Sequence, residues 1–360
     1  METVVKKRNA NMELLRMISM LMVVMLHALG KSECLVNVSA SPSVNGVIAW
    51  VLEMLSIAAV NIFVLISGYF LIDAKFKIRR LIELVLEAVF YGVLGFLICV
   101  LFKIEIGMDI DIYFLLQTFL PVHMDVFWFV TAYIVLYMLQ PVISAGVKAL
   151  SQKQLGTVVI LLIIYGSLFK SILPVRLETD ELGYDLVWFL TVFLVGAYFK
   201  LYGFKHLTSQ RKGMFAYLAA VLIVFLEKMV LFVFYTKFGL FDTITDSFVH
   251  YNNIFVLLEA VGLFAFFVNK KPMGEKAGKV ICFMSPMALG VYLFHENICF
   301  RYQWPKWLGI YGSLSDPSWL FVLRIFAAVL LVYVCGSVID YLRILLFKAV
   351  GRLFEKKNEA

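Results

Sequence analysis

The sequence predicts an all-α membrane protein with about ten transmembrane helices. Hydrophobic residues make up 62% of its 360 residues and only 16% are charged, against roughly 25% charged in an average soluble domain. A soluble chain of this composition has too little polar surface to cover a core, so lipid must solvate much of its exterior. Polar gaps also divide the chain at intervals of about 20 residues, the length of a helix that crosses a bilayer.

Taken in chain order, ten apolar runs are predicted to be spans. They cover residues 11–30, 46–72, 81–102, 126–145, 157–173, 187–203, 213–235, 251–268, 281–300 and 318–346. The first run follows the basic residues 6–8 and resembles an export signal, but the ionisable residues inside it favour a retained helix. The apolar segment Tyr113–Pro121 is shorter, so we expect an interfacial or re-entrant piece there.

The distribution of Lys and Arg predicts the orientation of these spans. With the N-terminus placed in the cytoplasm, the inner segments carry 22 of these residues and the outer segments carry 7. The positive-inside rule therefore predicts that both termini face the cytoplasm. Topology explains the formal charge of +7, so no nucleic-acid partner is predicted. We expect one membrane domain over residues 1–360, with no appended extracytoplasmic domain.

The cysteines and histidines give no sign of a metal centre. None of the five cysteines forms a C-x-x-C pair, and the five histidines show no H-E-x-x-H spacing. The sequence therefore predicts neither a disulfide framework nor a metal site.

Ionisable residues inside the first span point to a functional site, because such groups are costly in lipid. Arg16 and His27 are eleven residues apart, so they share a helix face and lie about 16 Å apart along its axis. Glu13 falls on nearly the same stripe. A purely structural interpretation stays open, in which Glu13 pairs with Arg16 at the interface and His27 reaches the outer headgroups.

Five groups of residues along the chain together form a recognisable set of motifs. They are Glu13-x-x-Arg16 continuing as R-x10-H to His27, Ser67-Gly68-Tyr69, the basic run Lys75, Lys77, Arg79 and Arg80, Trp128-Phe129-x-x-x-Tyr133 followed by Pro141, and Leu289-Gly290-x-Tyr292-x-x-His295. In this set and its order the chain resembles the acyltransferase-3 family of integral membrane acyltransferases. Two departures are Glu296, where many relatives have proline, and the missing extracytoplasmic hydrolase-like domain of longer relatives.

The resemblance implies transfer of an acyl group, usually acetyl, from cytosolic acetyl-CoA to a hydroxyl of a cell-surface polysaccharide or its lipid-linked precursor. It implies that Arg16, Arg79 and Arg80 bind the phosphates of the acyl-CoA, since guanidinium groups suit bidentate phosphate contacts. His27 would lie deeper, as general base or as the acceptor of a transient acyl group. Glu13 and His295 are the other predicted catalytic residues, with His295 orienting either the acceptor or His27.

The resemblance also suggests substrate contacts. Trp128 and Tyr133 would stack on a sugar or line the tunnel of the acyl-CoA arm, although aromatic residues near an interface are often belt residues. Ser67 and Tyr69 are placed at the same site, although small residues before Tyr69 are also typical of close helix packing.

Partners and location follow from the same resemblance. We expect membrane lipid, a glycan acceptor and polysaccharide-assembly proteins as partners, in a multi-pass position in a bacterial cytoplasmic membrane. Two alternatives stay open: a polytopic transporter of a glycan or small acid, and a succinyltransferase of the same family. The Arg16 and His27 alignment favours an enzyme, because it suits a phosphate-bearing ligand better than a solute path.

Overall fold

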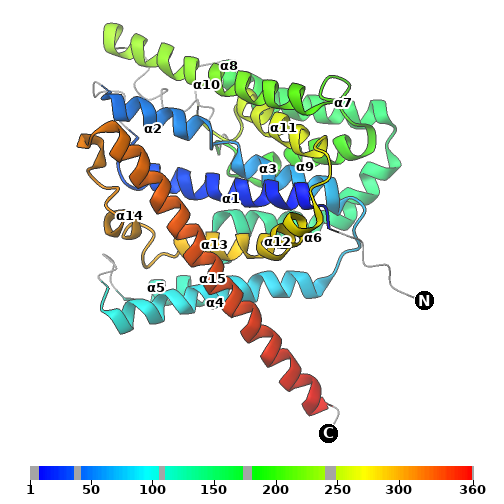
Figure 1. The fold of residues 1–360 in the computed structure, drawn as a ribbon. Coiled ribbons are helices and arrows are strands. Elements are labelled where there is room, and N and C mark those ends of the chain that lie inside the picture. The colour runs from blue at the N-terminus through cyan, green and yellow to red at the C-terminus, as the bar shows by residue number, and fades with distance from the viewer. Residues whose placement is uncertain (1–7, 36–41, 105–109, 173–180, 240–248, 359–360) are drawn as a thin grey trace.

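The computed structural model describes residues 8–35, 42–104, 110–172, 181–239 and 249–358, and within these segments the chain is all helical (Figure 1). The α-helices are α1 (Ala10–Gly30), α2 (Val44–Met54), α3 (Ala59–Leu71), α4 (Ile78–Phe102), α5 (Ile112–Phe119), α6 (Trp128–Ala149), α7 (Gln152–Ile163), α8 (Phe169–Ile172), α9 (Leu186–Tyr202), α10 (Gln210–Phe238), α11 (Ile254–Val268), α12 (Glu275–Met284), α13 (Ala288–His295), α14 (Trp304–Trp307) and α15 (Ser318–Asn358).

The predicted membrane architecture is confirmed. Eight helices or helix pairs of the described chain are long and apolar enough to cross a bilayer, and α9 and α11 are shorter apolar helices. Three of the eight are interrupted: α2–α3, α7–α8 and α12–α13 each form one span in two pieces. The segment expected to be too short for a crossing forms the eight-residue helix α5, which is not among the spans.

Some predicted boundaries differ from the observed ones. The span predicted over 281–300 begins earlier, at Glu275, and its helix ends at His295. The last helix runs beyond the predicted residue 346 to Asn358, because residues that are polar in sequence still continue its backbone hydrogen bonding. Both errors arise because hydropathy marks the apolar part of a helix and not its backbone ends.

Local sequence sets several helix starts. Asn9 caps α1, where its side-chain oxygen accepts hydrogen bonds from the backbone N–H groups of Asn11 and Met12. Ser151 begins α7 in a capping box with Gln154. Such caps satisfy N–H groups that have no partner within the helix.

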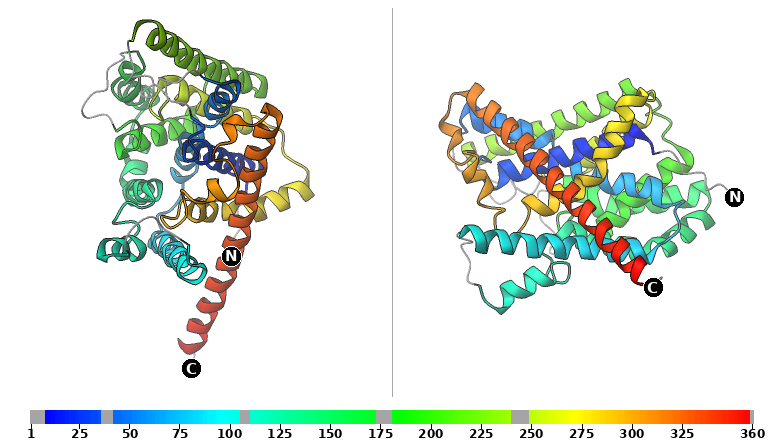
Figure 2. Two further views of the ribbon diagram at one scale, coloured as in Figure 1. Left: turned by 90° about the vertical axis from the view of Figure 1, so that its left-hand side faces the viewer. Right: turned by 60° about the horizontal axis from the view of Figure 1, so that its bottom comes forward.

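Helix α1 lies at the centre of the bundle (Figure 1; Figure 2, left). It contacts α2, α3, α11, α12, α13 and α15. In its most apolar window 61% of the residues are buried inside the protein, against 28% for α10 and 22% for α7–α8. The helix that carries three ionisable residues is therefore surrounded by protein, whereas α10 and α7–α8 present mostly apolar outer faces.

Glycine allows α3 and α9 to cross closely. A Cβ atom added at Gly68 would lie 2.0 Å from the backbone oxygen of Phe193, and one added at Gly196 would lie 2.4 Å from that of Leu65. No side chain fits at either position, so each glycine brings one backbone against the other. Small residues have this use in helix pairs packed within membranes.

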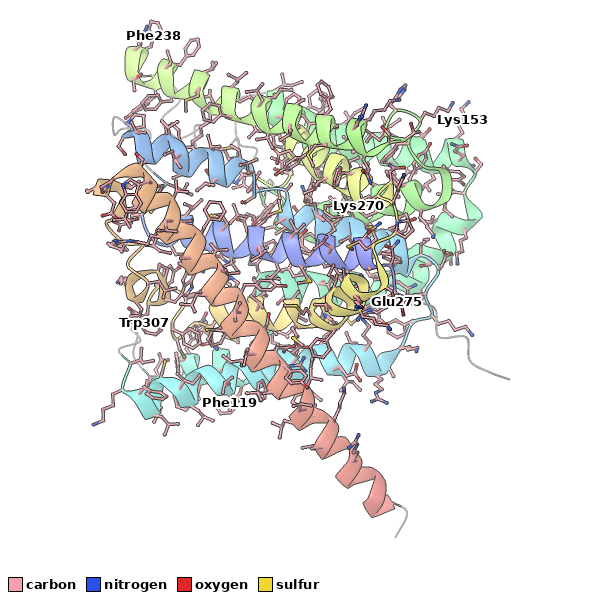
Figure 3. The ribbon with its side chains drawn as sticks, in the orientation of Figure 1. Phe119, Lys153, Phe238, Lys270, Glu275 and Trp307 are labelled. Atoms are coloured by element: carbon pink, nitrogen blue, oxygen red, sulfur yellow. The ribbon has the colours of Figure 1, made fainter. Side chains whose placement is uncertain are left out.

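The predicted inner and outer segments lie at opposite ends of the bundle. Lys153 and Glu275, which are in predicted inner loops, lie toward the end of the bundle at which Figure 1 marks the N-terminus (Figure 3). Phe238 and Trp307, from predicted outer segments, lie toward the other end. This separation agrees with the alternation of spans, while the assignment of one end to the cytoplasm stays a prediction.

Candidate active site

A cavity of about 260 Å³ runs beside α1. Six of the ten predicted site residues line it: Arg16, His27, Ser67, Arg80, Trp128 and Tyr133. Arg16 and His27 therefore do share one face of α1, and that face is turned to a cavity. Its middle is lined by apolar side chains that include Met20, Val23 and Phe63.

Guanidinium groups gather at one end of this cavity, which we call the Arg16 end. Arg16 donates from Nη1 to both carboxylate oxygens of Glu13, each at 3.0 Å. Arg8 also reaches Glu13, with Nε 3.2 Å from Oε1. Ser285 donates to the same carboxylate at 2.5 Å. Glu13 is thus buried and fully bonded, and it holds Arg16 against the cavity.

The break between α12 and α13 supplies Ser285 to this end. The turn Ser285–Met287 contains Pro286, which has no backbone N–H to donate. Side chains must repair such breaks where water is scarce. The carbonyl oxygen of Cys282, four residues before Pro286, accepts from Arg8 Nη1 at 3.2 Å, and the buried Ser285 hydroxyl donates to Glu13 of α1.

The side chains of the two adjacent arginines of α4, Arg79 and Arg80, point in different directions. Arg80 lines the cavity and donates to the Tyr133 hydroxyl at 3.4 Å. Arg79 pairs with Glu83 at 2.8 Å, its side chain is 88% exposed, and it is not among the cavity-lining residues. Neighbours on a helix point about 100° apart, so one arginine facing the cavity turns the other away.

Two histidines meet at the other end, which we call the His27 end. His27 Nδ1 lies 2.8 Å from His295 Nε2 and 3.1 Å from Glu296 Oε1. His295 Nδ1 lies 2.6 Å from the carbonyl oxygen of Val291. Both predicted histidines therefore belong to one cluster, although they are 268 residues apart in the chain.

Lys31 completes the His27 end. Its ammonium group forms a salt bridge with Glu296 Oε1, just after the end of α1. Burial lowers the pKa of Lys31, while Glu296 acts in the opposite direction and Arg301 in the same direction as burial. The side chain of Glu296 is only 9% exposed, so the pair is shielded from solvent.

The aromatic residues of the cavity also divide into two groups, of which one lies at the Arg16 end. Trp128 lies 5.7 Å from Tyr251 in a stacked arrangement and 4.5 Å from Tyr184. Burial raises the pKa of the Tyr184 hydroxyl. Tyr133, one and a half turns further along α6, instead contacts Arg80 at the Arg16 end.

Ser67 and Tyr69 occupy different surroundings. Ser67 lines the cavity, and its hydroxyl donates to the Phe63 carbonyl oxygen at 2.9 Å. The close packing expected of this segment is made by the next residue, Gly68. Tyr69 is outside the cavity lining, where it packs against Phe264 and under the Lys200 ammonium at 4.6 Å.

Comparison with known proteins adds the family. The family model described as Acyltransferase domain, of the acyltransferase-3 type, matches residues 9–339. This chain belongs to the acyltransferase-3 family. No curated protein and no solved structure matches it.

Membership makes this acyltransferase-3 chain a membrane acyltransferase, and the matched region contains every predicted site residue. The match ends inside α15, one residue before a buried ionic group. There Asp340 accepts from Arg343 Nε at 2.6 Å and from the Tyr91 hydroxyl at 3.0 Å, and Arg343 lies 3.1 Å from Glu87. Glu87 also lines the cavity. Helix α15 is thereby tied to α4 and to the cavity wall.

Several residues of this acyltransferase-3 chain that line the cavity or contact its lining residues were missed by the motifs. Glu296 had been noted only as a departure from the family pattern, and Arg8 only as a topology charge. Tyr251 and Ser285 also line the cavity or bond to its residues. A usable signal existed for Glu296 alone, since a carboxylate in an apolar run suggests function.

The His27 end also contains the ligand types of a metal site. Three possible ligand atoms, one each from His27, His295 and Glu296, lie within 4.8 Å of one another. Two imidazoles and a carboxylate are a known set of zinc ligands. However, the Lys31 ammonium already binds the Glu296 oxygen that faces His27. A cation there would meet another cation, so the absence of a metal stays our prediction.

Proposed function

We propose that this protein transfers an acyl group, normally acetyl, from acyl-CoA to a hydroxyl of a cell-surface polysaccharide or its lipid-linked precursor. The observation that supports this most is a single cavity with guanidinium groups at one end and a histidine at the other. The protein would act in a bacterial cytoplasmic membrane, with the Arg16 end facing the cytosol. Polysaccharide-assembly proteins would deliver the acceptor.

The Arg16 end suits the donor. The phosphates of acyl-CoA carry several negative charges and cannot enter hydrocarbon, so they need cationic partners at the membrane surface. Arg8, Arg16 and Arg80 line the cavity there, and guanidinium groups bind phosphate oxygens in pairs. The long, mildly polar pantetheine arm then suits the apolar middle of the cavity.

His27 suits the transfer step. It lies about 16 Å deeper along α1 than Arg16, which is comparable to the reach of a pantetheine arm. As general base, His27 takes the proton of the acceptor hydroxyl while its oxygen bonds to the acyl carbon. The C–S bond breaks, and the thiolate receives the proton from His27. A transient acyl-imidazole is the alternative route with the same products.

The aromatic group around Trp128 suits the acceptor. Trp128 and Tyr251 both line the cavity, and their rings are stacked. Flat aromatic faces offer a sugar ring a large apolar contact, while the tyrosine hydroxyl remains a hydrogen-bonding group. The acceptor would therefore approach from the His27 end, opposite to the donor.

The direct experiment uses purified protein in proteoliposomes with radiolabelled acetyl-CoA. Release of free coenzyme A thiol and transfer of label to added membrane glycan are both measured, for the wild type and for His27→Ala. We expect a rate about 100- to 10,000-fold lower for the variant, since a general base contributes about 10²–10⁴-fold. Wild-type rates in the variant would reject the role of His27.

A second measurement fixes the donor and acceptor. Succinyl-CoA run beside acetyl-CoA separates the succinyl alternative, and glycan analysis of a deletion strain looks for lost ester-linked acyl groups. Unchanged ester content in that strain would reject a polysaccharide acceptor. Protein that releases no thiol from either donor would reject acyl-CoA as the substrate.

A further inference from the structure

We propose that Glu296, held by Lys31, is a positioning residue that fixes the proton of His27 on Nδ1 and leaves Nε2 as the base. This inference rests on the proposed function and assigns a role in the transfer step to a carboxylate other than Glu13. Glu13, the carboxylate expected from the sequence, bonds to Arg16 at the other end of the cavity. Glu296 is the carboxylate that contacts His27.

The hydrogen-bonding pattern determines which nitrogen carries each proton. The Val291 carbonyl oxygen only accepts, so His295 Nδ1, 2.6 Å away, must be the protonated nitrogen. A neutral imidazole carries one N–H, and His295 Nε2 is therefore an acceptor. It lies 2.8 Å from His27 Nδ1, which must then donate.

Glu296 reinforces the same assignment. Its Oε1 lies 3.1 Å from His27 Nδ1, and a carboxylate only accepts. His27 Nδ1 therefore faces two acceptors, His295 Nε2 and Glu296 Oε1. Its other nitrogen, Nε2, makes no hydrogen bond within the described residues, while the ring lines the cavity. The unprotonated nitrogen is thus the one available to an acceptor hydroxyl.

The geometry of α13 places the carboxylate. His295 is the last residue of the helix, and the backbone N–H of Glu296 donates to the Tyr292 carbonyl oxygen at 3.0 Å. This bond closes the final turn and fixes the direction in which the Glu296 side chain leaves the helix. Both groups that face His27 Nδ1 therefore come from consecutive residues of one rigid turn.

Lys31 explains how a carboxylate can be kept there. A buried charge is costly unless it is paired, and Lys31 pairs with Glu296 Oε1, the same oxygen that faces His27 Nδ1. The resting pair is neutral. When His27 Nε2 takes the hydroxyl proton, the new positive charge of the imidazolium lies beside the carboxylate, which stabilises it. When Nε2 passes the proton to the thiolate, the resting state returns.

A double variant that removes both charges of the Lys31 and Glu296 pair can distinguish a role in catalysis from a role in stability alone. Three variants are compared with the wild type: Glu296→Gln, Lys31→Met and the double variant. Each single change leaves a buried charge without its partner, so both should melt earlier than the wild type. The double variant removes both charges and should recover most of the melting temperature.

Activity should not follow stability. We expect kcat to fall about 100-fold in Glu296→Gln and to stay that low in the double variant, with KM for acetyl-CoA within twofold of the wild type. Lys31→Met keeps the Glu296 carboxylate, so it should retain more activity than Glu296→Gln or the double variant. Glu275→Gln, an exposed salt-bridged glutamate on α12, is the matched control and should behave as the wild type.

Three outcomes would overturn the inference. Recovery of kcat in the double variant would show that only charge balance matters. Stoichiometric zinc in the purified protein, lost together with activity on Glu296→Gln, would make the cluster a metal site. If Glu296→Gln is fully active while His27→Ala is inactive, this inference fails alone. If the wild type releases no thiol from acyl-CoA, the proposed function fails instead.

Discussion

The two ends of the cavity use charge in opposite ways. At the Arg16 end, three guanidinium groups line the space. The Glu13 carboxylate is shared between Arg8 and Arg16, and the Glu87 carboxylate of the cavity wall is paired with Arg343. Positive charge is left over there for an anionic ligand. At the His27 end, the charges of Lys31 and Glu296 balance each other beside the paired imidazoles of His27 and His295.

Under the proposed function, this difference separates donor binding from reaction on one helix. An anionic ligand supplies the missing negative charge, so an excess of arginine is tolerated where the ligand arrives. A reacting group needs an environment that is balanced before the reaction and that stabilises the charge formed during it. In that proposal, helix α1 carries the binding residue Arg16 and the reacting residue His27 on one face, eleven residues apart.

The largest expected effect tests whether buried charges hold the protein together more than exposed ones. Asp340→Ala leaves Arg343 with one fewer buried partner, and we expect about 3 kcal/mol lower stability, since breaking a buried pair costs several kcal/mol. Glu83→Ala removes the exposed partner of Arg79 and should cost less than about 1 kcal/mol. Unfolding in mild detergent measures both. Equal effects would contradict the distinction.

A change in the crossing of α3 and α9 should weaken the protein without removing a charged group from either end. Gly68→Ala places a Cβ 2.0 Å from the Phe193 oxygen, and overpacking of this kind costs about 1–3 kcal/mol. Gly146→Ala is the control, because nothing lies within 4 Å of its added Cβ. The melting temperature should drop for Gly68→Ala and not for Gly146→Ala. A stable Gly68→Ala protein would mean that α3 and α9 cross less closely.

The neighbouring arginines of α4 give a sharper test of the Arg16 end. Arg80→Met should raise KM for acetyl-CoA about tenfold with kcat nearly unchanged, which corresponds to about 1.4 kcal/mol of binding. Arg79→Met should leave both constants unchanged, because that side chain points away from the cavity. Acetyl-pantetheine, which lacks the nucleotide, should not distinguish the Arg80 variant from the wild type. A larger effect at Arg79 would reverse the assignment.

The smallest expected effect concerns the acceptor. Trp128→Leu removes the ring stacked on Tyr251, and loss of an aromatic contact of about 1 kcal/mol should raise KM for the glycan a few-fold. Release of thiol from acetyl-CoA without acceptor should stay unchanged. A raised KM for acetyl-CoA would place Trp128 beside the donor and remove the contrast between the two ends.

The sequence anticipated the parts of the site that lie on single helices. The stripe of Glu13, Arg16 and His27 follows from helical periodicity alone, and the structure places Arg16 and His27 on one cavity wall. Helical periodicity could not predict which of Arg79 and Arg80 faces the cavity. Periodicity says that adjacent residues diverge, and only the packing of α4 decides which of them faces inward.

Composition, hydropathy and the spacing within α1 were enough by themselves to fix a multi-helix membrane protein and one face of its central helix, because both depend on residues close together in the chain. The meeting of His27 with His295, Glu296 and Lys31 was decided only by the tertiary structure. Residues 268 positions apart come within hydrogen-bonding distance when α13 packs on α1. No local pattern encodes that approach, because it results from the packing of the whole bundle.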